Sequence, residues 1–590
     1  MRKRFSVLMI TLCLLLSACT NNSESGSTNS KGANGTTPTS TTATTAEENV
    51  KASGTQAEVY DQNLAYLQGN FGPFFEKSGE SEKVAKYEEP IKVSVSNWYT
   101  PTMESSMTKF GAMYGETMEA NRWTDAMKRM FNIDVAYKWW SPDGDYNAKL
   151  RLDMTANDLP DIFLVREQSD LIQLAESGSI WDLSELMDKW GADIDKEAWE
   201  SDDGALLEMA SYDGKLYGLP SSVSHTDNFS YLWIRKDWME KLKLERPKTM
   251  GELEVIIDSF VNADLDGNGA KDTTGLVIDK SLFYNTRGIF SAFAAYPEIW
   301  VETANGLQWG ATAEENKAAL KFLANQYAKG NIDKEFITKS NTDAMESILN
   351  GKAGIVLGGH WIGHTLGDLH ELDPESDWIS VPIPSGNGNT VKAPIVPSNH
   401  GWLVVNSKFE HPEIAFKMRA LHSYTLKDKN AEWWWYEDNV AWNFSPVRAN
   451  VSAFDNLFTY RNIMEAYEKN NDTSMLRAKA VPYWANLHGP LKWEWELMFG
   501  PGEDAAMSTL DEFYKEDRLF YNAFLGAQSS FMQERWSTIQ DEQLIAFTKM
   551  IIGEIGIDKG FSAWVDTFNN LGGDKITLEV NEWFKAYQKK

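Results

Sequence analysis

The sequence is poor in cysteine, in basic side chains and in long apolar runs, and each shortage excludes a class of protein. Its 590 residues include two cysteines, both within the first 19 positions, so a disulfide-stapled scaffold is excluded. The 56 basic residues are outnumbered by 85 acidic ones, and a formal charge of −29 would repel the phosphate backbone of a nucleic acid. Beyond residue 16 no apolar run is long enough to span a membrane.

The remaining composition is that of a folded protein. Hydrophobic residues make up 42% of the chain, aromatic residues 12% and charged residues 24%, which favours globular structure over a disordered chain. At this length, more than one domain or lobe is expected. The 24 tryptophans are the conspicuous feature, because each supplies a large flat surface for a core or for a ligand.

The N-terminus has the pattern of an export signal. Basic residues at positions 2–4 precede an apolar stretch over 5–16 and a tetrapeptide Leu-Ser-Ala-Cys that ends at Cys19. This tetrapeptide resembles a bacterial lipobox. We therefore expect residues 1–18 to be removed as a lipoprotein signal peptide and Cys19 to carry the lipid that holds the chain at a membrane. An ordinary signal peptide with an incidental cysteine is the alternative.

The segment after Cys19 predicts a flexible tether over 19–56. Within residues 20–45, 21 of 26 side chains are Ser, Thr, Asn or Gly, and none is aromatic or a large aliphatic. Such a segment cannot form a core and would reach about 25–30 Å from end to end. An N-terminal extension of the folded body follows over 57–89.

Strand and helix patterns alternate from residue 90 onward. This order favours a parallel sheet with crossover helices, in which ligands lie beyond the carboxyl ends of the strands. The predicted elements are a strand over 91–95, a helix over 107–131, a strand over 133–137, a helix over 146–155, a strand over 161–165 and helical periodicity over 170–190. Four residues take the positions at the strand ends, namely Asn97, Trp98, Arg166 and Glu167.

Two landmarks lie in the middle of the chain. A segment over 214–220, which begins with a glycine and ends with a proline, leads to a polar loop with His225 and Asp227. An apolar segment that contains Trp233 follows. Further on, Thr249 and Glu252 have the spacing of a capping box. This spacing predicts a helix over about 250–261.

Three more landmarks follow in order along the chain. The segment 350–355 precedes Gly-Gly-His-Trp ending at Trp361, the segment 397–402 contains Asn399 and Trp402, and Gly-Gly-Asp over 572–574 precedes the C-terminus. Together with the two earlier landmarks, this succession resembles the extracytoplasmic solute-binding proteins of carbohydrate uptake, in their large lipoprotein branch. In that family a tryptophan placed like Trp361 commonly stacks on the bound sugar.

The resemblance implies an architecture and a partner. It implies a two-lobe α/β fold of the periplasmic-binding-protein type (type II), with crossover strands between the lobes and a helical C-terminal part. It also implies that a carbohydrate, expected to be an oligosaccharide, is captured in the interlobe cleft and passed by a monomer to the permease subunits of an ABC importer. We expect the lobes over 90–228 with 386–450 and over 229–385 with 451–590.

Tryptophan carries the ligand prediction. A sugar ring packs its C–H groups on an aromatic plane and offers its hydroxyls to planar polar side chains. Position and resemblance place Trp98 and Trp361 first as stacking platforms, whereas roughly half or more of the tryptophans should be core. Trp434 is included for the aromatic cluster 433–436 alone. The expected ligand-binding residues are Asn97, Trp98, Arg166, Glu167, His225, Asp227, Trp233, His360, Trp361, Asn399, Trp402 and Trp434.

An acidic loop that begins at Asp264 resembles an EF-hand calcium loop. Oxygen side chains stand at positions 1, 3, 5 and 9 of the loop, and a glycine at position 6 permits the turn. Position 12 is Gly275 instead of glutamate, so we expect a structural calcium ion without regulated opening. A solvated acidic turn is the alternative. The expected ligands are Asp264, Asp266, Asn268, the Ala270 carbonyl, Asp272 and Thr273.

Two enzyme-like alternatives have weaker signals. His360 and His364 have the i, i+4 spacing of a zinc-binding helix, but no glutamate follows His360 as a metalloprotease requires. A secreted glycoside hydrolase would use two carboxylates about 5–10 Å apart. The 85 acidic residues leave that possibility open, although no local motif marks such a pair.

Overall fold

The computed structural model describes most of the chain beyond the N-terminal segment. The predicted signal peptide, Cys19 and nearly all of the predicted tether lie outside the described residues. No helix within the described part is long and apolar enough to cross a membrane. The described residues are 56–270, 272–431, 434, 437 and 440–589.

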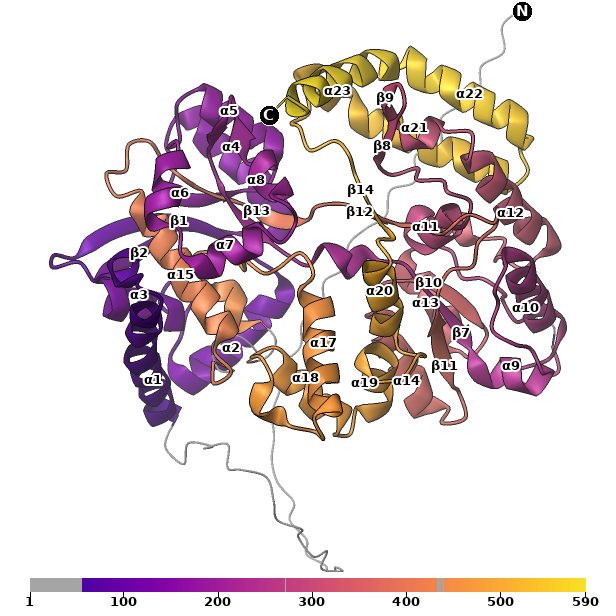
Figure 1. Ribbon diagram of the computed structural model, residues 1–590, viewed down its shortest axis with the longest axis horizontal. Helices are drawn as coiled ribbons and strands as arrows, with labels where there is room; N and C mark the ends of the chain where they lie inside the picture. Colours follow the sequence, from indigo (N-terminus) through magenta and orange to yellow (C-terminus); the bar gives the residue numbers. More distant parts are fainter. Residues whose placement is uncertain (1–55, 271, 432–433, 435–436, 438–439, 590) are drawn as a thin grey trace, which may run out of the picture. The chain divides into compact units, whose positions relative to one another are not determined.

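Two hydrophobic cores organise the described residues, and we name the parts around them the first body and the second body. The first core is built by residues between 64 and 219 and between 402 and 447. The second core is built by residues between 229 and 395 and between 453 and 584. Both bodies mix helices with strands (Figure 1), which confirms the predicted α/β class with two lobes.

The first body contains a five-stranded sheet in the order β2-β1-β3-β13-β6. β1 pairs in parallel with β2 and β3, as predicted, whereas β13 is antiparallel to both β3 and β6. The sheet is therefore mixed. Its elements are α1 (Gln56–Lys77), β1 (Ile91–Tyr99), α2 (Pro101–Tyr114), α3 (Arg122–Phe131), β2 (Ile133–Pro142), α4 (Tyr146–Ala156), β3 (Ile162–Val165), α5 (Gln168–Glu176), α6 (Ser184–Trp190), α7 (Asp193–Trp199), α8 (Ala205–Met209), β4 (Ser211–Tyr212), β5 (Lys215–Leu216), β6 (Leu219–Ser222), β13 (Asn399–Val405) and α15 (Glu413–Lys427).

The helix predicted over 107–131 is two helices in the structure, and the reason is local. α2 ends where Gly115 takes a left-handed conformation with φ of 76°, which glycine adopts without strain. α3 then begins with its own capping box. The Asn121 side chain accepts from the Thr124 backbone N–H, and the Thr124 side chain accepts from the Asn121 backbone N–H. The prediction of one long helix was wrong because apolar periodicity continues on both sides of the break and does not reveal it.

The second body contains a three-stranded antiparallel sheet in the order β10-β7-β11 and a helical C-terminal part. The capping box of Thr249 and Glu252 starts α10 as predicted. Its elements are β7 (Tyr231–Arg235), α9 (Lys236–Leu242), α10 (Met250–Asn262), α11 (Phe283–Ala292), β8 (Trp300–Thr303), β9 (Gly306–Trp309), α12 (Asn316–Lys329), α13 (Asn341–Leu349), β10 (Ile355–Gly358), α14 (Ile362–Leu372), β11 (Trp378–Val381), β12 (Ala393–Ile395), α17 (Asp455–Glu468), α18 (Ala480–Leu487), α19 (Lys492–Phe499), α20 (Ala506–Lys515), β14 (Leu519–Tyr521), α21 (Ser530–Ile551), α22 (Ile557–Asn570) and α23 (Gly573–Tyr587).

Three stretches of chain pass between the two bodies and hydrogen-bond to one another. Val391, Ala393 and Ile395 still pack in the second core, so the chain returns to the first body about ten residues later than the expected boundary at 386. The backbone bonds between the crossing stretches join Val223 to Ser398, Val451 to Ser222 and His225 to Ala453, at 3.3, 3.1 and 2.8 Å. Because few residues make these bonds, the crossing stretches are the natural place for a hinge.

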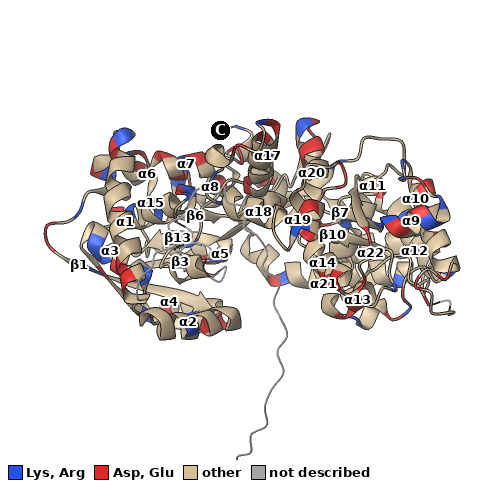
Figure 2. Ribbon diagram, turned by 90° about the horizontal axis from the view of Figure 1, so that it is seen from below, with Lys and Arg blue, Asp and Glu red and all other residues tan. Residues whose placement is uncertain are grey.

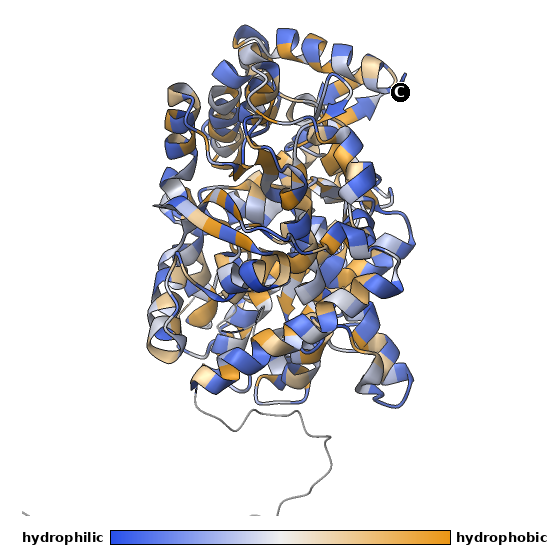
Figure 3. Ribbon diagram, turned by 90° about the vertical axis from the view of Figure 1, so that its left-hand side faces the viewer, coloured by the Kyte–Doolittle hydropathy of each residue, from blue (hydrophilic) through white to orange (hydrophobic). Residues whose placement is uncertain are grey.

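The N-terminal extension packs on the first body. α1 buries four apolar side chains at helical spacing, namely Leu64, Leu67, Phe71 and Phe75. Its opposite side is hydrophilic, and Figure 3 shows the same alternation of hydrophilic and hydrophobic positions along the other helices. The extension is therefore an integral part of the first body.

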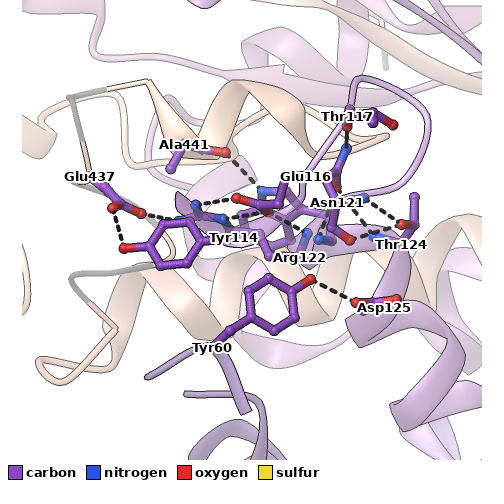
Figure 4. Close-up of polar contacts among 11 residues, drawn as sticks. Tyr60, Tyr114, Glu116, Thr117, Asn121, Arg122, Thr124, Asp125, Glu437 and Ala441 are labelled. Carbon is purple, nitrogen blue, oxygen red and sulfur yellow. Dashed lines mark hydrogen bonds and ion pairs between the residues drawn. The ribbon is translucent and has the colours of Figure 1, made fainter. Parts of the chain in front are cut away.

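A closed polar network lies beside α3 (Figure 4). The Arg122 guanidinium donates to Glu116 at 2.6 Å and to Glu437 at 2.7 Å, and both carboxylates point at it. The Tyr114 hydroxyl donates to the second oxygen of Glu437 at 2.8 Å. The side chains of Arg122 and Glu116 are 1% and 2% exposed. This network ties Glu437 to the first body.

Charged side chains lie on the outer turns of the helices. Figure 2 shows acidic and basic positions interspersed on helices such as α3, α9 and α10. Many of them pair at the surface, as Lys329 does with Glu254 and Asp258 at 2.7 and 2.8 Å. Exposed pairs of this kind contribute little to stability, so the acidic excess is mainly a solvated surface.

Candidate functional site

The first candidate face surrounds Trp98 at the carboxyl end of β1. The indole is only 7% exposed, because two guanidinium groups lie over its ring. The guanidinium carbon of Arg448 is 3.7 Å and that of Arg166 is 4.7 Å from the ring centroid. Tyr146 meets the indole edge-on at 5.1 Å. Trp98 is therefore a support for two cations.

Arg448 is held by a dedicated set of acceptors. Its Nη2 donates to Asn97 Oδ1 at 2.7 Å and its Nη1 donates to Asn443 Oδ1 at 2.7 Å. Asn97 is itself fully buried, and its amide donates to the Ser445 carbonyl at 3.0 Å. Burial lowers the pKa of Arg448 to about 9. Arg448 still carries its charge at neutral pH.

Arg166 and His400 complete the first face. Arg166 is partly exposed and donates to Asp143 Oδ1 at 2.8 Å. The His400 ring lies 6.1 Å from the Trp442 ring. Burial, followed by the nearby charge of Arg448, lowers the pKa of His400 to about 4, so the imidazole is neutral under ordinary conditions. The face thus offers one partly exposed cation, one carboxylate and a neutral imidazole.

The second candidate face surrounds Trp361, directly after β10. Trp361 exposes 37% of its surface. Its ring lies nearly parallel to that of Tyr284, at 17° and 6.4 Å between centroids. His360 packs edge-on between Trp361 and Phe499, and its Nδ1 has no hydrogen-bond partner among the described residues. An open aromatic plane therefore stands beside a buried nitrogen without a partner.

A polar strip runs from the crossing stretch into α17 and the segment before α18. Asn456 donates to Asp227 at 2.5 Å, and Lys479 donates to Asn456 and to Asp455, both at 2.6 Å. Burial raises the pKa of the Asp227 carboxyl. The charge of Lys479 also helps to lower the pKa of His360, chiefly lowered by burial, to about 3. The strip therefore lies close to the Trp361 face.

Three of the expected tryptophan contacts are corrected by the structure. Trp233 is 0% exposed in the central strand β7, Trp402 is 3% exposed in β13, and Trp434 is 1% exposed. The Trp434 ring packs edge-on against Trp123 in the first core. Trp233 and Trp402 stand inside strands and Trp434 packs in the first core, so none of the three offers a surface to a ligand in this structure. The predictions for these three residues are wrong for this structure.

The other expected residues divide between surface and interior. Asp227 belongs to the polar strip. Glu167 accepts from Asn147 at 3.1 Å beside α5, and Asn399 accepts from the Gly401 backbone at 2.7 Å at the start of β13. His225 is 1% exposed among the crossing stretches, 3.8 Å from Asp202. Burial lowers the pKa of His225 to about 4, so this residue is a neutral part of the crossing region.

Several residues at the two faces were not predicted from the sequence. Tyr284 stacks on Trp361, and the charge of Lys479 acts on the neighbouring His360. Both lie far from Trp361 in sequence and come near it only through tertiary packing. Arg448 had a weak signal, since it is a basic residue in a stretch that passes between the bodies. Asp143, which begins a short 3-10 helix over 143–145, accepts from Arg166.

The histidine pair does not form a shared site with a third ligand in the described part of the chain. His364 lies 3.4 Å from Glu494, whereas His360 is buried against Phe499. Among the described residues, no three His, Cys, Asp or Glu side chains are arranged to hold one metal ion.

The acidic loop brings its oxygens together through its own hydrogen bonds. The Asn268 amide donates to Asp266 at 2.6 Å and to Asp272 at 2.9 Å, and Lys352 contacts Asp272. Gly269 donates its backbone N–H to Asp264 at 3.1 Å. The hard oxygen donors of a calcium site are present, but in this structure the Asn268 amide hydrogen-bonds to Asp266 and Asp272, and the Lys352 ammonium pairs with Asp272.

Thr273 differs from its predicted role as a calcium ligand. Its side chain is buried, and its hydroxyl donates to the carbonyl of Phe260 near the end of α10 at 3.0 Å. This bond fixes the loop to the helix and leaves the hydroxyl facing away from the carboxylates. Among the predicted calcium ligands, the carboxylates of Asp264, Asp266 and Asp272 are therefore better candidates than the Thr273 hydroxyl.

Two curated relatives from Bacillus subtilis cover most of the chain. Lipoprotein LipO is 22% identical over 462 residues, which are 76% of this chain and 86% of that protein. The polygalacturonan/rhamnogalacturonan-binding protein YtcQ is 24% identical over 499 residues, which are 82% of this chain and 92% of that protein.

Solved structures share the fold. A solute-binding protein from Bifidobacterium longum infantis, described as HMO-binding, matches with a TM-score of 0.58 and 16% identity over 85% of this chain and 100% of that one. FusA of Streptococcus pneumoniae in complex with kestose matches with a TM-score of 0.55 and 16% identity over 84% of this chain and 99% of its own, and an EF-hand mutant of FusA matches with 0.53. At this identity the likeness shows the fold alone.

The family model for bacterial extracellular solute-binding proteins matches residues 115–418, which include Trp361 and most of both sheets. The matched range is 304 of the 590 residues, more than half of the chain. The chain therefore belongs to the bacterial extracellular solute-binding protein family.

Proposed function

We propose that this protein binds an oligosaccharide between the Trp98 face and the Trp361 face and delivers it to an ABC importer. The single observation that carries the proposal is the Trp361 face, where an exposed indole rests on Tyr284 beside the unpartnered Nδ1 of His360. The family supports binding of a solute without chemical change. The carbohydrate named for YtcQ and the kestose bound to FusA support the ligand class.

Recognition divides between stacking and hydrogen bonding. The C–H face of a sugar ring would pack on Trp361, whose plane is already oriented by Tyr284. Hydroxyl groups would donate to His360 Nδ1 and to Asp227, and would accept from Lys479. On the opposite face Arg166 would donate to the ligand, and Trp98 would hold that arginine in place. Asn97 would not contact the ligand itself but would hold Arg448 in place by accepting its hydrogen bond.

Delivery requires the ligand to be enclosed and the protein to stay near the membrane. The crossing stretches would allow the two bodies to close on the ligand by a hinge motion. The sequence has no Gly-rich phosphate-binding loop, so the permease and the ATPase would be separate chains. The lipid on Cys19 and the tether are proposed to keep the binding protein at the outer face of the membrane as a monomer.

The test is a binding screen combined with an assay for turnover. Purified protein is mixed with neutral and acidic oligosaccharides of two to six units, and tryptophan fluorescence reports binding while new reducing ends report hydrolysis. Saturable binding without new reducing ends is the expected result. Sustained release of reducing ends would instead support a glycoside hydrolase, and no binding by any glycan would contradict the carbohydrate proposal.

A structural calcium ion is a second, separate proposal. Asp264, Asp266 and Asp272, with the Asn268 side-chain oxygen, supply hard oxygen donors. These side chains are not arranged around one point in this structure, so an ion would have to draw them together and displace Lys352 from Asp272. Calcium-related neighbours such as the EF-hand mutant of FusA support it. Chelation should lower the unfolding temperature of the wild-type protein but leave that of Asp266→Ala unchanged. Equal unfolding temperatures of the wild type with and without chelator would contradict the site.

A further inference from the structure

A cavity of about 590 Å³ lies between the two bodies, apart from both faces of the candidate site. It is lined by the start of α8 and the residues before it, and by the ends of α20, β14 and α23 from the second body. No residue of the Trp98 face, the Trp361 face or the polar strip lines it. Its volume falls in the range that small-molecule sites occupy.

The lining of this cavity has one sign of charge. Its principal side chains are Asp202, Asp203, Asp517, Tyr514, Tyr521 and Tyr587, and none of the described residues that line it is basic. The neighbouring Arg518 is engaged elsewhere, since it pairs with Glu512 and Glu516 at 2.9 and 3.1 Å. The three carboxylates therefore have no counter-charge within the cavity.

Asp202 supplies a second, independent observation. Its side chain is 3% exposed, and its Oδ1 has no hydrogen-bond partner in the described chain. The other oxygen accepts from the Leu206 backbone at 3.1 Å. The nearest imidazole, His225, is 3.8 Å away and neutral, because burial lowers its pKa to about 4. A buried carboxylate oxygen without a donor is costly, and a cationic donor in the cavity would remove that cost.

The arrangement distinguishes between kinds of cation. No three acidic side chains among the described residues converge on one point, so a compact divalent ion could not use all three aspartates. An extended cation with separated ammonium groups could reach them one by one. Tyr521 exposes 42% of its surface and offers an aromatic face, which attracts ammonium groups.

We propose that this cavity is a second binding site, for a linear polyamine. Its ammonium groups pair with Asp202 and Asp203 on the first body and with Asp517 on the second, and its methylene segments pack on the tyrosines. A bound polyamine therefore joins the two bodies through residues that belong to neither face of the carbohydrate site. The proposal is independent of the carbohydrate-binding function.

The test is calorimetric titration of the purified full-length protein with spermidine. We expect one saturable site, and we expect Asp203→Asn and Asp517→Asn each to weaken binding by about three- to tenfold, since each removes one charge-assisted contact. Tyr521→Ala should weaken binding by about threefold, whereas Tyr521→Phe should retain it. The matched control is Asp566→Asn, which removes an exposed carboxylate on α22 and should leave the affinity unchanged.

The outcomes separate this proposal from its alternatives. Equal weakening in Asp566→Asn would show diffuse attraction to an acidic surface and overturn the site. Binding of calcium, or of a lysine-rich peptide, through Asp203 and Asp517 without binding of spermidine would also overturn it. Trp361→Ala should keep the spermidine affinity of the wild type, so failure of the carbohydrate proposal and failure of this one are measured separately.

Discussion

Trp98 and Trp361 occupy equivalent places in their two bodies, yet they differ in what covers them. Each stands at or just beyond the carboxyl end of a strand. Trp98 is 7% exposed beneath two guanidinium groups, whereas Trp361 is 37% exposed and rests on a single tyrosine ring. The strand end brings both indoles to the rim of a sheet, and the neighbours then decide whether the indole supports other side chains or meets a ligand.

The largest expected effect comes from removing the cation above Trp98. Arg448→Leu should lower the free energy of unfolding by about 3 kcal/mol, because the acceptors on Asn97 and Asn443 lose a buried charged donor. Urea unfolding followed by circular dichroism measures the loss. Arg166→Leu is the control, since Arg166 is partly exposed and its loss should cost under about 1 kcal/mol. Similar losses in the two variants would show that the guanidinium groups have equal roles.

The next effect is on Trp98 itself. Trp98→Ala should lower the free energy of unfolding by about 3 kcal/mol, because a buried indole leaves a cavity beneath Arg448 and beside Tyr146. The same urea titration measures it. Trp98→Phe keeps an aromatic plane and should recover part of the loss. If Trp98→Ala unfolds like the wild type but binds oligosaccharide weakly, the indole is a ligand platform after all.

The sequence predicted the positions of these residues better than their surroundings. Strand alternation placed Trp98 and Arg166 at one sheet edge, and the capping box placed the start of α10. The burial of side chains could not be predicted from the sequence in this way. Trp233 and Trp402 are buried because β7 and β13 each have a neighbouring strand on both sides, and this pairing is known only from the structure. Tyr284 and Lys479 were missed because long-range packing alone brings Tyr284 to Trp361 and Lys479 near His360.

A smaller effect, on affinity instead of stability, is expected at Trp361. Trp361→Ala should weaken oligosaccharide binding by roughly 2 kcal/mol, about thirtyfold in Kd, because the exposed plane carries the stacking contact. Its free energy of unfolding should change by less than about 1 kcal/mol, since the side chain is partly exposed. Fluorescence titration and urea unfolding measure the two quantities. Trp361→Phe should bind better than Trp361→Ala, and a large stability loss with intact affinity would reverse the comparison of the two indoles.

The smallest effect concerns protons at the first face. The pKa of His400 is lowered to about 4 by burial, whereas an unfolded histidine titrates near 6.5. As the pH falls from 6.5 toward 4, His400 becomes protonated in the unfolded chain but stays neutral in the folded chain. The free energy of unfolding therefore decreases through this pH range. Replacing His400 by Gln should reduce the slope of unfolding free energy against pH by at most about 1.4 kcal/mol per pH unit.

Urea titrations at pH 5.0, 6.0 and 7.0 measure this slope. His411→Gln is the matched control, because it removes a histidine whose side chain is 41% exposed, and it should retain the wild-type slope. His360 and His400 should add no pH dependence to the oligosaccharide affinity between pH 5 and pH 8, since both are neutral there, with pKa values of about 3 and 4. A change at the acid end of this range is expected only from Asp227, whose pKa burial raises. An affinity that drops near pH 6.5 would mean that one of these imidazoles is more accessible to water than its burial implies, and His400→Gln would identify whether it belongs to the Trp98 face.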